Sequence, residues 1–145
     1  MLKTWRETMK GAISEVLETM FFTPVEFIGE LQQQPLCGCR SVIVLKNEKI
    51  YQAAFYFVDA HARMITANFL GKMEDEVSSD EVMDTLKEVA NMIGGSFIYH
   101  GAMEDYKLGI PAFAWLDDQA QPNLQDGLPF FLDGDLFGLA VLTQG

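Results

Sequence analysis

The chain has 145 residues, 49% of them hydrophobic, and a formal net charge of −11 at pH 7. This length suits a single domain with a sizeable core, and so apolar a composition excludes intrinsic disorder. The acidic balance offers no basic stripe for phosphates, which argues against nucleic-acid binding. The sequence has no apolar run long enough to span a membrane, and Arg6, Glu7 and Lys10 interrupt any signal-peptide core. We therefore expect one cytoplasmic domain over residues 1–145, with no membrane partner.

The first half of the chain predicts helices around a hairpin. An amphipathic helix is expected over residues 4–22. Residues 37–45 and 50–58 are rich in β-branched and aromatic side chains and flank a polar turn, so they predict a β-hairpin. A shorter helix should follow over residues 59–70, and Gly71 can end it because glycine readily adopts positive φ.

A second long amphipathic helix is the most informative element of the chain. Its apolar positions recur at spacings of 4, 3 and 4: Val82, Leu86, Val89 and Ile93. Ser79 or Asp80 can cap its start. We expect the helix to end at Gly94–Gly95, where a residue with positive φ is available.

The remaining segments read as antiparallel strands. Strands are expected at about 95–104 and 107–116, followed by a polar loop over residues 117–127. Residues 128–132 and 136–143 should form a final hairpin around an Asp-Gly turn. The whole order predicts an α+β domain, an antiparallel β-sheet with long amphipathic helices packed on one face.

Polar side chains line the outer face of the second long helix. Asp84, Glu88 and Asn91 lie at i, i+4 and i+7, opposite the apolar positions. A carboxylate and a carboxamide one turn apart can grip a cation and orient a water molecule, as hydrolysis of an acyl phosphate requires. The alternative is that this stripe is only the solvated side of an amphipathic helix.

Part of the first helix resembles the second. Residues 11–22 align with residues 84–95 without a gap, and Glu15 falls on Glu88. The apolar register is kept, but Glu18 takes the place of the amide. This similarity suggests a duplicated unit in which one helix lacks the polar equipment of the other, although amphipathic helices also resemble one another by construction.

The D-x-x-x-E-x-x-N helix, the first helix with AISEVLETMFF, and residues 108–111 resemble the CheC/CheX/FliY chemotaxis phosphatases, most closely the single-site CheX type. The resemblance implies a pseudo-duplicated fold and hydrolysis of the aspartyl phosphate on a CheY-like response regulator. It implies that Glu88 meets the active-site lysine of the receiver domain and that Asn91 holds the attacking water. Asp84 matches the leading acidic position of the motif and would join Glu88 in binding the partner. Glu18 implies that only one site works.

The resemblance makes a phosphorylated receiver the expected partner, with Mg2+ on that receiver and no cofactor or metal of the chain's own. A non-catalytic adaptor that binds a receiver or its own copy is the main alternative, and a homodimer is left open. A third hypothesis is a small-ligand sensor that uses Tyr51, Phe55 and Phe57, which a packed sheet face explains as well.

Cys37 and Cys39 have no second cysteine pair to complete a metal site, so we expect reduced thiols. Asp133–Asp135 lacks the further ligands of a calcium loop, and a tight turn is the better explanation.

Overall fold

A computed structural model describes residues 4–29 and 37–145 of the chain. The helices are α1 (Trp5–Phe21), α2 (Asp59–Leu70) and α3 (Ser79–His100), with short 3-10 turns at η2 (Glu74–Glu76), η3 (Asp118–Ala120) and η4 (Leu124–Asp126). The strands are β1 (Cys37–Lys46), β2 (Ile50–Val58), β3 (Lys107–Leu108), β4 (Ala112–Trp115), β5 (Leu128–Leu132) and β6 (Asp135–Gln144). No helix in the described parts of the chain is long and apolar enough to cross a membrane.

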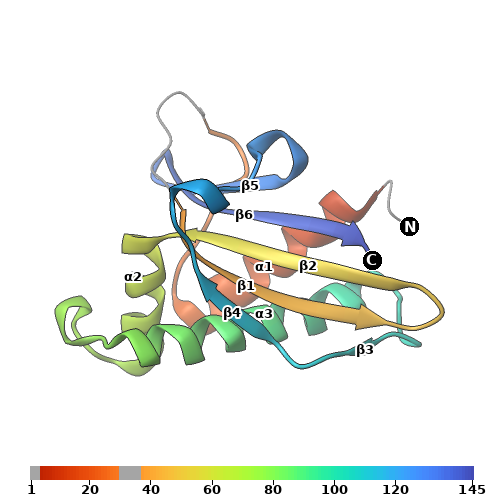
Figure 1. The fold of residues 1–145 in the computed structure, drawn as a ribbon, viewed down its shortest axis with the longest axis horizontal. Coiled ribbons are helices and arrows are strands. Elements are labelled where there is room, and N and C mark those ends of the chain that lie inside the picture. Colours follow the sequence, from red (N-terminus) through yellow and green to blue (C-terminus); the bar gives the residue numbers. More distant parts are fainter. Residues whose placement is uncertain (1–3, 30–36) are drawn as a thin grey trace.

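One antiparallel sheet organises the domain, in the order β3-β1-β2-β6-β5, and β4 also pairs with β1. Figure 1 shows α1 and α3 behind this sheet and α2 at one end of it. The predicted α+β class, with long helices on one face of an antiparallel sheet, is confirmed. The duplication of α1 and α3 stays a prediction.

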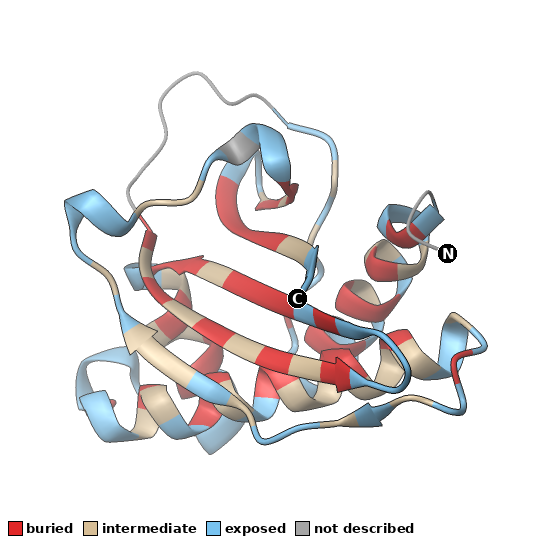
Figure 2. Ribbon diagram, turned by 45° about the vertical axis from the view of Figure 1, so that its right-hand side comes forward, coloured by how far each residue is buried: buried red, intermediate tan, exposed pale blue. Residues whose placement is uncertain are grey.

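The core lies between the sheet and the two long helices. Side chains on one face of β1 are buried and those on the other are half-buried, an alternation that Figure 2 shows as bands along the strand. Tyr51, Phe55 and Phe57 of β2 are at most 3% exposed and face the same core. These aromatic residues are therefore packing residues, which removes the support for a ligand sensor.

The prediction that α3 ends at Gly94–Gly95 is wrong, and so is the strand expected over residues 95–104. The helix continues to His100 with Phe97 buried on its inner face. Gly94 is buried against the sheet, where an added Cβ would lie 3.0 Å from Leu108 Cδ2 and 3.1 Å from Ile43 Cγ2. Glycine favours this close approach of the helix to the strands, because a Cβ here would make Leu108 and Ile43 shift by a few tenths of an ångström, and it does not act as a terminator.

The edge of the sheet beside α3 is built from two short strands instead of the single strand expected over residues 107–116. Both pair with β1: Leu108 lies opposite Leu45, and Phe113 lies opposite Ser41. Residues 109–111 interrupt the ladder, and Pro111 within them has no N–H to donate to it. β3 and β4 therefore form the edge of the sheet beside β1, and both contact α3.

The final hairpin is confirmed by the pairing of β5 with β6. Asp133 and Gly134 have φ values of 52° and 86° at its tip. Positive φ at both central residues is typical of the tight turns that match the twist of two antiparallel strands. Asp133 is thus a turn residue of this hairpin.

Candidate functional site

The candidate site is the outer face of α3. Asp84 and Glu88 are exposed and Asn91 is partly exposed. The apolar positions of the same helix are all 0% exposed: Val82, Leu86, Val89 and Ile93. The division of the helix into a buried and an outward face, expected from the sequence, is confirmed, and Asn91 is less exposed than the two carboxylates.

The N-terminal end of α3 is fixed by a capping box. Ser78 Oγ accepts a hydrogen bond from the Glu81 N–H at 3.1 Å, and Glu81 Oε1 accepts one from the Ser78 N–H at 3.0 Å. The N-cap is therefore Ser78, one residue before Ser79 and two before Asp80, the two predicted positions. Lys72 Nζ lies 2.6 Å from Glu81 Oε2 and is the first cause of the lowered pKa of Glu81. Glu81 is thus occupied in holding the helix start.

The polar stripe formed by Asp84, Glu88 and Asn91 contrasts with this paired start of the helix. Within residues 4–29 and 37–145, Asp84, Glu88 and Asn91 have no hydrogen-bond or ion-pair partner among side chains. They sit on a rigid helix, which is a more precise platform than a loop. A carboxylate and an amide held in this way can meet a cation and a water molecule brought by a partner.

Three further residues of this face were missed by sequence reasoning. Lys87 is partly exposed and is the only lysine or arginine of α3. Gly95 lies one turn beyond the amide, and Tyr99, which is 78% exposed, lies one turn further. A helical projection of residues 79–100 would have placed all three on the stripe. The expected end of the helix at Gly94 hid the last two.

The first helix is equipped differently. Glu15, which aligns with Glu88, has its Oε2 atom 2.5 Å from Nε2 of His100 at the end of α3. The carboxylate on α1 therefore has an internal partner, whereas Glu88 on α3 has none among residues 4–29 and 37–145. Glu18 is exposed at the position that aligns with Asn91. The two helices align in sequence, but they do not offer the same side chains to a partner.

Other reactive residues do not form a site. Burial raises the pKa of Cys37 to about 11 and that of Cys39 to about 12, so both thiols are protonated at neutral pH. His61 stacks on Phe137 with ring centroids 4.4 Å apart, and burial lowers its pKa. Across the described ranges, no group of three or more His, Cys, Asp or Glu residues is placed to hold a metal ion.

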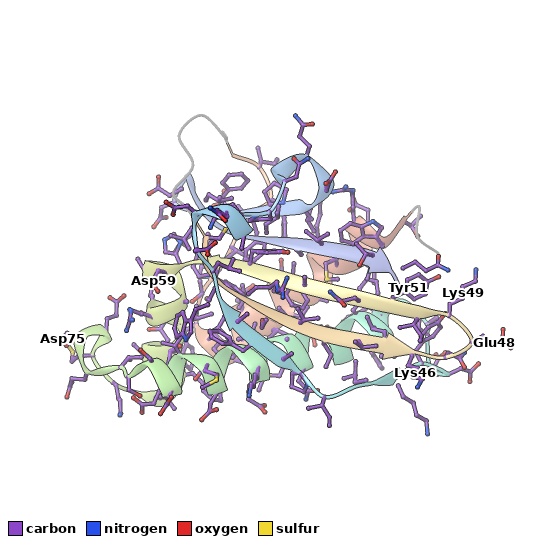
Figure 3. All side chains as sticks on the ribbon, viewed as in Figure 1. Lys46, Glu48, Lys49, Tyr51, Asp59 and Asp75 are labelled. Atoms are coloured by element: carbon purple, nitrogen blue, oxygen red, sulfur yellow. The ribbon has the colours of Figure 1, made fainter. Side chains whose placement is uncertain are left out.

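Other charged residues of the surface lie at the two ends of the molecule, away from the polar stripe of α3. Figure 3 shows Lys46, Glu48 and Lys49 around the tip of the β1–β2 hairpin and Asp75 at the opposite end of the molecule. The hairpin tip mixes both signs of charge and carries its amide, Asn47, in a bend and not on a regular element. The outer face of α3 is therefore the candidate with the clearest chemistry.

Comparison with solved structures finds the same fold in chemotaxis proteins. CheX from Vibrio vulnificus is 17% identical, with a TM-score of 0.72 over 96% of this chain and 96% of that chain. A chain of the CheX–CheY–BeF3–Mg2+ complex from Borrelia burgdorferi is 20% identical, with a TM-score of 0.72 over 94% and 96%. The FliM middle domain from H. pylori is 13% identical, with a TM-score of 0.65 over 99% and 91%. At these identities the matches establish a shared fold.

The sequence comparisons identify the family. No significant match was found among curated proteins. The family profile described as "Chemotaxis phosphatase CheX" matches residues 41–125, a range that contains the whole of α3 and the sheet edge formed by β3 and β4. Because this profile covers more than half of the sequence, the chain belongs to the CheX family of chemotaxis phosphatases.

Proposed function

We propose that this protein hydrolyses the aspartyl phosphate of a CheY-like receiver domain and that α3 is its docking and catalytic helix. The observation that carries the proposal is the pair Glu88 and Asn91, on the outward face of a helix fixed at its start by a capping box. Neither has a side-chain partner in the part of the chain that the structure describes. Membership of the CheX family and the fold shared with the CheX–CheY complex support the receiver as partner.

The reaction needs a water molecule in line with the scissile P–O bond. The receiver's own lysine and Mg2+ supply the positive charge that stabilises the phosphoryl oxygens. Asn91 contributes a carboxamide, which offers both an acceptor and a donor and so fixes the orientation of the water. The water oxygen bonds to phosphorus, the aspartate leaves as a carboxylate, and the protons of the water remain with the released phosphate.

Glu88 sets the register of the complex. Its free carboxylate lies one turn before Asn91 and can form a charge-assisted hydrogen bond with the receiver lysine. Asp84 lies one further turn away and extends the acidic contact. No covalent intermediate on this chain is required, because the amide acts on water and not on phosphorus.

The test uses the protein's cognate receivers, each phosphorylated on its aspartate. We expect the wild-type protein to accelerate phosphate release from at least one receiver. Glu88→Lys should abolish both release and complex formation, because it sets a cation against the receiver lysine. Lys49→Gln, at the tip of the β1–β2 hairpin and not on α3, is the charge-changing control and should behave as wild type.

A non-catalytic adaptor is the second candidate, because the same fold occurs in differently named proteins such as the FliM middle domain. Complex formation without faster phosphate release would favour it over the phosphatase. A homodimer stays a prediction, and light scattering of the purified protein measures it directly.

A further inference from the structure

Two adjacent glycines lie in the interior of α3, although glycine is among the least favourable residues there. Gly94 is explained by the fold, since an added Cβ would press on Ile43 and Leu108. Gly95 has no such explanation. A Cβ at Gly95 would meet only Leu108 Cδ1, at 3.9 Å, which is ordinary van der Waals contact. Nothing within the described molecule requires the side chain to be absent.

Gly95 lies on the line of the candidate site. It follows Asn91 by four residues and Glu88 by seven, and Tyr99 follows it by another four. At about 100° per residue, these four positions span only about 80° of the helix surface. The bare backbone of Gly95 is therefore a gap in the stripe, with the amide of Asn91 on one side and the exposed ring of Tyr99 on the other.

We propose that this gap admits a backbone segment of the receiver domain beside its phosphorylated aspartate, and that Gly95 and Tyr99 are positioning residues for the reaction. The inference rests on the proposed function. Asn91 must reach a water molecule next to the phosphorus atom, so receiver segments that flank the aspartate come within about one helical turn of it. A side chain at Gly95 would hold these segments away, and the exposed ring of Tyr99 packs against them.

An open glycine is not by itself evidence of a contact. Among the described residues, nothing lies within 4 Å of a Cβ added at Gly11 of α1 either. It lies inside a helix whose Glu15 is already paired with His100, and the position aligned with Asn91 holds Glu18. Gly95 differs because it sits on the same line as Glu88 and Asn91 and one helical turn before the exposed ring of Tyr99. Gly11 is therefore a matched control.

The test compares Gly95→Ala with Gly11→Ala. Both should raise the melting temperature by about 2–4 °C, because alanine favours the helix and neither methyl group meets an obstacle. Gly95→Ala should lower kcat/KM at least about 10-fold, since small displacements of a positioned water slow hydrolysis strongly. It should also weaken binding to a receiver activated with beryllofluoride. Gly11→Ala should leave both measurements unchanged.

Tyr99→Phe should retain activity and Tyr99→Ala should lose about as much as Gly95→Ala, because the proposed role belongs to the ring and not to the hydroxyl. Unchanged turnover and binding in Gly95→Ala would overturn the inference. A loss of activity together with a lower melting temperature would also overturn it, because the glycine would then serve the fold. If the wild-type protein releases no phosphate from any receiver, the proposed function fails, and the binding measurements still test Gly95 as a contact.

Discussion

Replacing Asn91 by alanine separates catalysis from folding and from docking. The Asn91 side chain has no internal hydrogen bond in the described chain, so its removal leaves no buried group unpaired. The free energy of unfolding should change by less than about 1 kcal/mol, and alanine's higher helix propensity favours a small gain. Turnover should nevertheless fall on the order of 100-fold, equivalent to about 2.7 kcal/mol of transition-state stabilisation.

The assay follows phosphate release from a receiver phosphorylated on its aspartate, at several receiver concentrations. We expect a lower kcat at nearly unchanged affinity for the beryllofluoride-activated receiver, because the amide acts on the water in the transition state. Asn91→Asp is an informative companion, since it keeps the shape of the side chain but adds a negative charge beside the phosphoryl oxygens. If Asn91→Ala releases phosphate as fast as wild type, the proposed water-positioning role is refuted.

Four further predictions concern the first helix, the sheet and the thiols. Glu18→Ala should leave turnover close to wild type in the same assay, and a large loss with the fold intact would show that α1 carries an active site. Gly138→Ala should lower the free energy of unfolding by about 2–3 kcal/mol in a denaturant titration, because its Cβ would lie 2.5 Å from the carbonyl oxygen of Tyr56; unchanged stability would contradict the packing of β6 on β2. Cys37 and Cys39 should resist thiol reagents at pH 8 in the folded protein and react on unfolding. Rapid labelling of the native protein would contradict their burial. The free energy of unfolding should also decline as the pH rises above about 9, where the unfolded thiols ionise and the folded ones stay protonated, as denaturant titrations at increasing pH would measure.

Local patterns were sufficient for the elements whose signals agree with one another. The β1–β2 hairpin, the last hairpin and the start of α1 lie within a residue or two of the predicted positions, because side-chain alternation and turn residues specify them locally. The division of α3 into a buried and an outward face also followed from spacing alone, since a 3.6-residue period determines which side chains share a face. Glu88 and Asn91 could therefore be proposed as site residues from the sequence.

Tertiary contacts decided the features for which the local signal has two meanings. A glycine pair can end a helix or allow it to approach a sheet, and the choice at Gly94 depends on Ile43 and Leu108. Ile43 is 51 residues away in the sequence (94 − 43), so no window around α3 contains this information. The same holds for the contact between Glu15 and His100, which exists only because α1 and α3 pack together. Periodicity determines which face of a helix is polar, but only the neighbours in space determine how far the helix runs and which of its polar groups remain free for a partner.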